Sequence, residues 1–346
     1  MNSLTQAQHD QLFTNAEVLV AKVSRVKLHQ KVGDNAQRYF DLASLTKPLA
    51  TTLLFMIAVQ DGLLTLTDTV DAYLPTTTLT GVTLTRLLNH TSPLTDWFDF
   101  KTIGLKKSAF AQNKKTILAQ ILNNKELLRH TPGVVYSDLG FMLLGAILET
   151  VHGDDLATLF AQQIAKPLGI ARDAFFVPLH HKPLSAVSHF VPTEKCTWRK
   201  KLLQGEVMDE NAFLMGGVAG HAGLFATATA VHRILSELRL ARLGKSKFIT
   251  RDCFQIFCEP TTTRSVAKRY FTLGFDTPTQ PGSQSGKKFS KKSIGHLGYS
   301  GTSFWWDLQK DFWVILLTNR CIQGRENHKF ATWRPEFYDQ LVRSIL

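Results

Sequence analysis

Apolar and polar positions along the chain predict strands at its two ends and helices between them. Apolar runs at residues 18–20 and 26–29 predict an opening hairpin. Apolar side chains then recur at helical spacing, which predicts a helix from Ser44 through Gln60. Gly62 is expected to end this helix, because glycine is the usual residue just after a helix terminus.

The middle of the chain predicts helices, and the last third predicts strands. Helical patterns, with loops between them, lie at residues 84–89, 115–128, 139–151, 156–168 and 225–243. Strand patterns lie at residues 271–275, 293–298, 303–307 and 312–319, before a closing helix at 336–346. This order predicts an α/β fold of the α+β type. Residues 1–60 and 224–346 would form a sheet-bearing subdomain, and residues 61–223 an inserted, mostly helical one.

The composition is that of a globular protein with a large core, since 44% of its 346 residues are hydrophobic. Its four cysteines form no Cys-x-x-Cys pair and no zinc-like spacing, so we expect reduced thiols and no metal site. The start of the chain is polar, without a basic segment followed by an apolar run, which argues against a secretory signal. The longest apolar stretch, residues 53–59, is too short to span a bilayer. These features predict a cytoplasmic protein with no membrane partner.

The chain carries a net charge of +12 at neutral pH, and its densest basic run lies in a Gly/Ser-rich loop. The run consists of Lys287, Lys288, Lys291 and Lys292. No aromatic side chains form a binding platform beside it and no nucleic-acid-binding motif accompanies it, so a solvated loop is the better interpretation. We therefore expect no nucleic-acid partner, although the charge could favour anionic substrates.

The tetrapeptide Ser44-Leu45-Thr46-Lys47 lies where a loop gives way to the first long apolar helix. Residues three apart lie on one face of a helix, so the Ser44 hydroxyl and the Lys47 amine are expected to share a proton. Serine is a poor nucleophile near neutral pH unless a neighbour takes its proton. A lysine can do so if burial or nearby positive charge lowers its pKa. The pattern is short, so its meaning depends on the rest of the chain.

Two further segments follow in order along the chain. Tyr136-Ser137-Asp138 stands just ahead of a predicted helix, and His296-Leu297-Gly298 leads into an aromatic strand. Together the three segments resemble those of the serine β-lactamase and penicillin-binding-protein superfamily, above all class C β-lactamases, D-alanyl-D-alanine carboxypeptidases and related esterases. Similar landmarks lie at residues 41–43, 87–92, 216–225 and 317–320. The resemblance implies a single β-lactamase/transpeptidase-like catalytic domain over residues 1–346, with an antiparallel sheet flanked by helices and an inserted all-α subdomain.

The resemblance also implies a reaction through an acyl-enzyme. Ser44 would be the nucleophile, and Lys47 and Tyr136 would form the proton-transfer pair, with the choice of base left open between them. A phenol can act as a base only if cations stabilise the phenolate, and Lys47 is the candidate cation. The backbone N–H groups of Ser44 and Tyr299 would hold the oxyanion, and losing one such donor typically costs about 3 kcal/mol of barrier lowering. No cofactor is implied.

Four residues are expected to contact the substrate, namely Asp138, His221, His296 and Gly298. Gly298 would let a substrate backbone approach the strand edge closely. His296 could supply a cation only when it is protonated. The next residue, Leu297, stands where most relatives have a threonine whose hydroxyl commonly helps to bind a substrate carboxylate. His221 lies in a Gly-rich stretch, where a functional and a structural role are equally open.

Asp138 stands where an asparagine is common among the relatives. An amide can donate a hydrogen bond to a substrate oxygen, whereas an ionised carboxylate can only accept one. Two other roles are open for Asp138. It could cap the helix that begins at Leu139, or it could pair with Lys47 and hold it as an ammonium, which would make Lys47 a poorer base.

The sequence therefore predicts a serine hydrolase that cleaves an amide or ester in a small molecule or short peptide, like a D-alanyl carboxypeptidase or a carboxylesterase. The changes at residues 296 and 297 weaken the case for an efficient β-lactamase, so a weak class C-type β-lactamase is one alternative, and Asp138 leaves the substrate preference open. Another is a non-catalytic ligand-binding or sensor protein on the same scaffold. That alternative would be expected to lack Ser44, Lys47 or Tyr136, and all three are present. The sequence predicts no oligomeric state.

Overall fold

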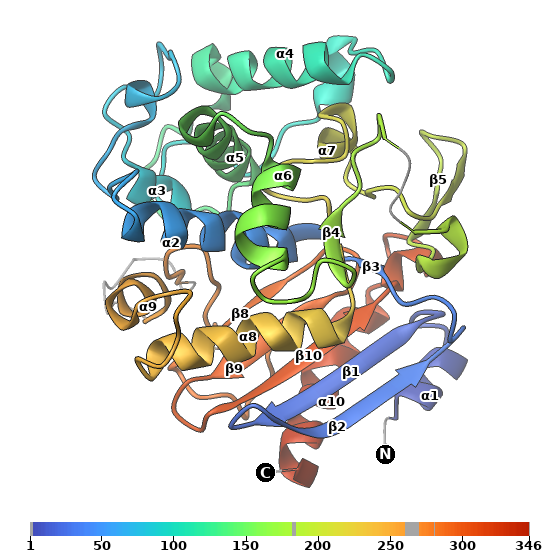
Figure 1. Cartoon of the computed structure of the whole chain (residues 1–346). Helices are drawn as coiled ribbons and strands as arrows, with labels where there is room; N and C mark the ends of the chain where they lie inside the picture. The colour runs from blue at the N-terminus through green and yellow to red at the C-terminus, as the bar shows by residue number, and fades with distance from the viewer. Residues whose placement is uncertain (1–2, 182–184, 260–269, 280, 346) are drawn as a thin grey trace.

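The centre of the fold is a five-stranded antiparallel sheet built from both ends of the chain (Figure 1). The computed structural model describes residues 3–181, 185–259, 270–279 and 281–345. The strands of the sheet are β1 Ala16–Lys22, β2 Arg25–Val32, β8 Ser293–Leu297, β9 Ser303–Asp307 and β10 Phe312–Thr318. They lie in the order β2-β1-β10-β9-β8. Because β1 pairs with β10, the first and last strands of the chain lie side by side within this sheet.

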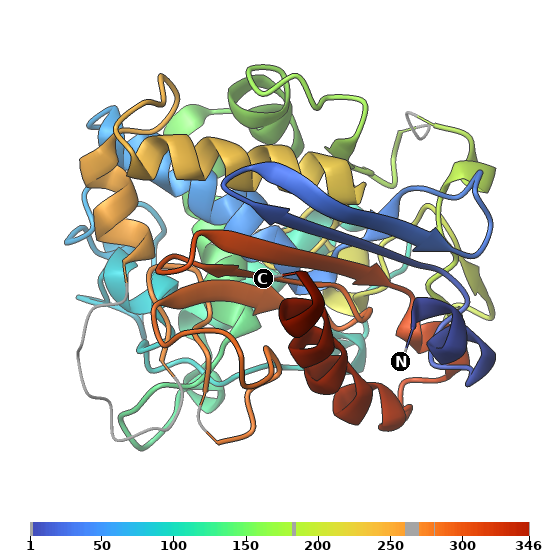
Figure 2. The same cartoon turned by 90° about the horizontal axis from the view of Figure 1, so that it is seen from below.

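Alternate side chains of the central strands pack into two different layers, as the period of two in a strand requires. On β10, the odd-numbered residues of 313–317 join the main hydrophobic core, which includes α8 (Ala228–Arg242). The even-numbered residues of 312–316 face the other way and meet α10 (Lys329–Ile345) and α1 (Leu4–His9). Figure 2 shows the sheet lying between α8 and α10.

The other helices gather on the α8 side of the sheet (Figure 1). They are α2 Thr52–Gln60, α3 Leu84–Leu88, α4 Phe110–Asn123, α5 Asp138–His152, α6 Leu156–Phe160, α7 Glu210–Leu214 and α9 Arg251–Cys258. Short helical turns at Ala43–Leu45 and Lys47–Thr51 lead into α2, so helical backbone runs almost unbroken from residue 43 to residue 60. Among the residues that the structure describes, this is the one helix long and apolar enough to cross a membrane, but 78% of it is buried inside the protein. It is therefore a core helix of this fold.

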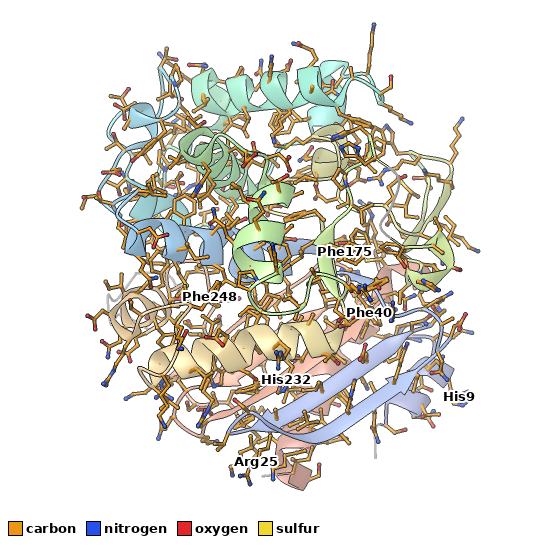
Figure 3. The ribbon with its side chains drawn as sticks, viewed as in Figure 1. His9, Arg25, Phe40, Phe175, His232 and Phe248 are labelled. Atoms are coloured by element: carbon orange, nitrogen blue, oxygen red, sulfur yellow. The ribbon has the colours of Figure 1, made fainter. Side chains whose placement is uncertain are left out.

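Two small sheets fix the loops around the helical turn at Ala43–Leu45. One consists of β3 (Phe40–Asp41), β7 (Leu224–Ala226) and β4 (Ala174–Phe176), in the order β3-β7-β4. Phe40 and Phe175, labelled in Figure 3, lie on the outer two of these strands. The other sheet pairs β5 (Glu194–Cys196) with β6 (Lys201–Leu203). The first small sheet matters most, because it fixes the residues that directly precede Ser44.

Most of the predicted elements are confirmed, including the opening hairpin and the strands that became β8, β9 and β10. The predicted helix at 225–243 begins instead at Ala228, because residues 224–226 pair as β7 and Thr227 then caps the helix by accepting the N–H of Ala230 at 3.1 Å. The predicted strand at 271–275 is wrong. The chain there makes a turn through Gly274, which has a φ of 95°.

The closing helix was expected to begin after Pro335, but it begins at Lys329 and contains that proline. Proline usually marks a helix start or end because it lacks an N–H donor. Here Phe330 and Trp333, both ahead of the proline, are buried against the sheet. Their burial holds the extra turns in place despite the lost hydrogen bond. Three short helices, α1, α7 and α9, were not predicted.

Candidate active site

Ser44 lies in a tight turn directly after β3. The buried Asp41 carboxylate accepts hydrogen bonds from the backbone N–H groups of Ala43, at 2.8 Å, and Met208, at 2.6 Å. Ala43 has a left-handed backbone with a φ of 47°, which is unfavourable for a residue with a Cβ. Burial raises the pKa of Asp41 to about 6, although both hydrogen bonds act against this rise. The left-handed backbone of Ala43 and the buried carboxylate of Asp41 are both unfavourable, and together they fix the backbone that carries Ser44.

Lys47 is fully buried one turn beyond Ser44, and oxygen atoms from several residues surround its Nζ. Nζ lies 2.9 Å from Ser44 Oγ, 2.7 Å from Asp138 Oδ1 and 3.2 Å from the backbone carbonyl oxygen of His221. Burial by itself would lower the pKa of this ammonium. The Asp138 carboxylate and the Tyr136 phenol outweigh burial, so the pKa of Lys47 lies above its ordinary value. At neutral pH, Lys47 is held as a cation.

Tyr136 completes the cluster, because its hydroxyl is hydrogen-bonded to both Ser44 and Lys47. Its ring packs against those of His90 and His296, at centroid distances of 4.7 and 5.7 Å. Burial raises the pKa of the phenol, and the adjacent Lys47 cation offsets this only in part. Tyr136 is therefore a neutral phenol at neutral pH, placed to donate or relay a proton.

Asp138 is the first residue of α5, and its carboxylate is directed to Lys47 rather than to the helix. The helix cap is Ser137, whose Oγ accepts the N–H of Gly140 at 3.3 Å. Of the roles left open for Asp138, the helix cap is therefore wrong and the pairing with Lys47 is confirmed. The Asp138 side chain is 17% exposed and lines the cleft described below. One carboxylate therefore faces both the buried cation and the space open to a ligand.

Residues 296–298, at the end of β8, dock directly onto the turn that holds Ser44. A Cβ added to Gly298 would lie 2.1 Å from Thr302 Oγ1 and 2.5 Å from the carbonyl oxygen of Leu42, so only glycine fits. Thr302 Oγ1 donates a hydrogen bond to the same Leu42 oxygen at 3.0 Å. Gly298 does line the cleft. However, the absence of a side chain at Gly298 leaves room for the protein's own backbone at Leu42.

The two histidines expected to contact substrate occupy different places. His296 is buried on β8, with Nδ1 2.9 Å from the carbonyl oxygen of Leu297, and it lines the cleft. His221 is also buried, but it is not among the cleft-lining residues, and its Nε2 lies 2.9 Å from Asp209 Oδ1. Burial would raise the pKa of Asp209, but His221 outweighs it and the pKa falls to about 2. Since the backbone carbonyl of His221 contacts Lys47, this geometry favours the structural role for His221.

A single cleft with a volume of about 760 Å³ opens these groups to solvent. The residues predicted for the site that line it are Ser44, Tyr136, Asp138, His296, Gly298 and Tyr299. Tyr299 is half exposed at the end of β8, so the two expected oxyanion donors, the N–H groups of Ser44 and Tyr299, belong to residues of one cleft. Residues from 320 to 334 line another wall, which we call the C-terminal wall. Within the described ranges, no three His, Cys, Asp or Glu side chains are grouped so as to hold a metal ion.

Sequence reasoning missed the arginines of the C-terminal wall, of which Arg334 is the most deeply buried. A signal for it was present. Arg334 lies four residues from Phe330 and four from Tyr338, so the three share one face of α10. Because that face is otherwise apolar and buried, a charged residue on it needs a partner or a function.

Comparison with known proteins is consistent with this geometry. The family model described as Beta-lactamase matches residues 13–331. The N-acetylmuramyl-L-alanine amidase of Bacillus subtilis (strain 168) is 31% identical over 312 residues, covering 81% of this chain and 68% of the relative. A protein of Escherichia coli (strain K12) named as a D-alanyl-D-alanine carboxypeptidase is 28% identical over 328 residues, covering 85% and 72%. The octameric penicillin-binding protein homologue from Pyrococcus abyssi has the same fold, with a TM-score of 0.71 at 16% identity over 99% of this chain and 75% of that one.

The fold and these relatives define the class of the protein, which is a serine hydrolase with a β-lactamase/transpeptidase-like fold. The chain belongs to the beta-lactamase family. The resemblance stated from its three short motifs is thereby confirmed over most of its length.

Proposed function

We propose that this protein hydrolyses a small amide through an acyl-enzyme formed on Ser44. The observation that carries the proposal is the 2.9 Å contact between Ser44 Oγ and Lys47 Nζ at the cleft, with the Tyr136 hydroxyl bonded to both. Two of its relatives are named for N-acetylmuramyl-L-alanine and D-alanyl-D-alanine bonds, both of which are amides. Soluble peptidoglycan fragments with one of these bonds are the proposed substrates.

Lys47 is the proposed general base, acting in its neutral form. Burial has raised the pKa of Tyr136, so a phenolate is a minor species, and the phenol is better suited to donate a proton. In the first step, Ser44 Oγ attacks the substrate carbonyl carbon and its proton passes to the Lys47 amine. The N–H groups of Ser44 and Tyr299 would stabilise the oxyanion that forms. Because Asp138 holds Lys47 as an ammonium, the reaction should become faster as the pH rises into the alkaline range.

Collapse of the tetrahedral intermediate then breaks the carbon–nitrogen bond. The amine leaves with a proton from the Tyr136 phenol, and the Lys47 ammonium returns a proton to the resulting phenolate. A water molecule next attacks the acyl-enzyme carbonyl, and its proton passes to neutral Lys47. The Lys47 ammonium then gives this proton to Ser44 Oγ as the ester bond breaks, which releases the carboxylic acid and restores the Ser44 hydroxyl and the neutral amine. The transfers among Ser44, Lys47 and Tyr136 run between groups that are already in contact.

The test compares the wild-type protein with Ser44→Ala on four substrates: N-acetylmuramyl-L-alanine, an acyl-D-alanyl-D-alanine peptide, p-nitrophenyl acetate and nitrocefin. We expect the wild type to hydrolyse at least one of the two amides and Ser44→Ala to hydrolyse neither. A fluorophosphonate probe should add its mass to Ser44 of the wild type. Ser108→Ala, an exposed serine away from the cleft, is the matched control and should retain both properties. Absence of labelling and of turnover would contradict the proposal and favour a ligand-binding protein, whereas turnover of the ester alone would identify an esterase.

A further inference from the structure

His90 lies two residues beyond α3, in the landmark segment 87–92, and the proposed mechanism gives it no role. Only 1% of its surface is exposed. Its backbone is left-handed, with a φ of 61°, which is uncommon for a residue with a Cβ. Backbone strain of this kind persists only where the surrounding structure holds it, and it is concentrated at functional sites. A buried polar ring on such a backbone is therefore a candidate for a role in the site.

The hydrogen bonds of His90 hold the backbone on both sides of Tyr136. The carbonyl oxygen of His90 accepts the N–H of Val135 at 3.0 Å. Its Nδ1 accepts the N–H of Ser137, also at 3.0 Å. These two donors directly precede and follow Tyr136 in the chain. Because both acceptors belong to one residue, the backbone of Tyr136 is fixed relative to His90 at two points.

The imidazole of His90 also packs against the side chain of Tyr136, with the two ring centroids 4.7 Å apart. Phe141 of α5 and Phe271 lie 5.3 and 4.5 Å from the imidazole centroid, so the ring is itself held between aromatic neighbours. Phe271 also stacks on the Tyr136 ring at 5.9 Å. Close packing of this kind leaves little room for the phenol to move. His90 therefore contacts both the backbone around Tyr136 and its side chain.

The bond to Ser137 also fixes the protonation state of His90. A ring nitrogen that accepts an N–H carries no proton of its own, so the imidazole is neutral and its proton is on Nε2. The Nζ of Lys47 already lies 4.9 Å from the centroid of the Tyr136 ring. A neutral imidazole therefore holds Tyr136 without adding a second positive charge beside this ring.

We propose that His90 is a positioning residue, which holds Tyr136 where its hydroxyl can give a proton to the leaving amine. His90 is not among the cleft-lining residues, so it acts through Tyr136 rather than on the substrate. A displacement of about 1 Å in a reacting group can lower a rate by about a hundredfold. The effect on rate rests on the proposed function, in which Tyr136 is the proton donor, but the two backbone hydrogen bonds do not.

The first test compares His90→Leu with His90→Asn, since these side chains have nearly the same shape and only asparagine can accept the Ser137 N–H. Asparagine also tolerates a left-handed backbone. For the amide that the wild type hydrolyses, His90→Leu should lower kcat by about tenfold to a hundredfold, with KM nearly unchanged. Hydrolysis of p-nitrophenyl acetate, whose leaving group needs no proton, should fall by less than about threefold. His90→Asn should stay within about threefold of the wild type on both substrates.

A double variant separates positioning from a general structural role. In a Tyr136→Phe background, His90→Leu should lower the amide rate by less than about twofold more, because the positioned hydroxyl is already gone. His130→Leu, the same change at an exposed histidine of the loop that leads to Tyr136, is the matched control and should leave both rates unchanged. Equal losses on the two substrates, a His90→Asn variant as slow as His90→Leu, or the full further loss in the Tyr136→Phe background would overturn the proposal. If His90→Leu does not fold, His90→Gly takes its place, because glycine adopts this backbone freely.

The second test is independent of turnover. Exchange of the Ser137 amide hydrogen with solvent, followed by NMR, should be about twofold to tenfold faster in His90→Leu, which corresponds to the loss of one ordinary hydrogen bond. In His90→Asn the exchange rate should stay near that of the wild type. An unchanged rate in His90→Leu would contradict the proposal whatever the kinetics show. If the wild type hydrolyses neither amide but this exchange still depends on the acceptor at residue 90, the proposed function fails and the positioning of Tyr136 by His90 stands.

Discussion

Two walls of the cleft deal with buried positive charge in opposite ways. On the wall that carries Ser44, the fully buried Lys47 meets the Asp138 carboxylate at 2.7 Å. On the C-terminal wall, Arg334 is nearly as deeply buried, but the oxygen that it faces belongs to the neutral side chain of Gln284. The first wall is electrostatically complete without a ligand, and the second is not.

This difference separates two uses of a buried cation. A cation paired within the protein has a fixed position and a raised pKa, so it can organise a reaction before any substrate arrives. An unpaired cation costs stability in the free protein and regains it when an anion binds. On this reasoning, the wall of Lys47 is the one suited to the proposed chemistry.

Removing the Tyr136 hydroxyl should break the paired wall with the largest effect on rate. We expect Tyr136→Phe to lower kcat/KM for an amide by about a hundredfold to a thousandfold, within the usual range for loss of a general acid. An amine needs a proton in order to leave, whereas p-nitrophenolate does not, so hydrolysis of p-nitrophenyl acetate should fall by less than about tenfold. Steady-state kinetics on both substrates measures the two losses. If they are equal, Tyr136 acts in the attack by Ser44 rather than as the proton donor.

Removing the Asp138 charge should leave the Lys47 cation without a carboxylate partner, which is the situation of Arg334. Since Asp138 raises the pKa of Lys47, Asp138→Asn should lower this pKa and move the acidic limb of the pH–kcat/KM profile to lower pH. The sign follows from the need for a neutral amine, which the wild type provides only at alkaline pH. The free energy of unfolding should also fall, by about 3 kcal/mol, because a buried cation loses its partner.

The matched control for this variant is Asp96→Asn, an exposed carboxylate of the same cleft that accepts the N–H of Trp97 at 2.9 Å. It should shift neither the pH profile nor the unfolding midpoint in denaturant. If the acidic limb of Asp138→Asn stays where the wild type has it, the Lys47 amine does not accept the serine proton.

The parts of the site that could be predicted from the sequence are those set by local spacing. Ser44 and Lys47 are three residues apart on a helix, and their 2.9 Å contact follows from helical geometry. The direction of the Asp138 side chain could not be predicted in this way. A helix cap and an ion pair both satisfy local rules, and the choice depends on how closely α5 packs against Lys47. The position of Arg334 on a wall of the cleft likewise depends on which surface α10 covers, and the sequence does not show this.

The same distinction applies to the fold. The strand at 303–307 was predicted with correct bounds, and all five of its residues are buried because both faces of the sheet are covered. The strand expected at 271–275 fails because Gly274 approaches Thr52 so closely that a Cβ would lie 1.9 Å from its Oγ1. That contact joins distant parts of the chain. At the closing helix, the local signal of Pro335 was outweighed by burial against the sheet.

The smallest effect should come from a change at Asp209. This residue contacts His221, whose backbone carbonyl in turn contacts Lys47. Asp209 Oδ1 caps α7 by accepting the N–H of Ala212 at 2.7 Å and lies 2.9 Å from His221 Nε2. The pKa of Asp209 is about 2 in the folded protein and 3.8 ordinarily, so its ionised form stabilises the fold above the ordinary value. By linkage this contribution is about 2 kcal/mol at neutral pH, and it is lost as the pH falls through the folded pKa.

Asn caps a helix equally well but carries no charge, so Asp209→Asn isolates the electrostatic part of this contribution. Denaturant unfolding should show wild type and variant differing by about 2 kcal/mol near neutral pH and converging at strongly acid pH. A gap that does not change with pH would mean that the shape of this side chain, rather than its charge, supports the wall.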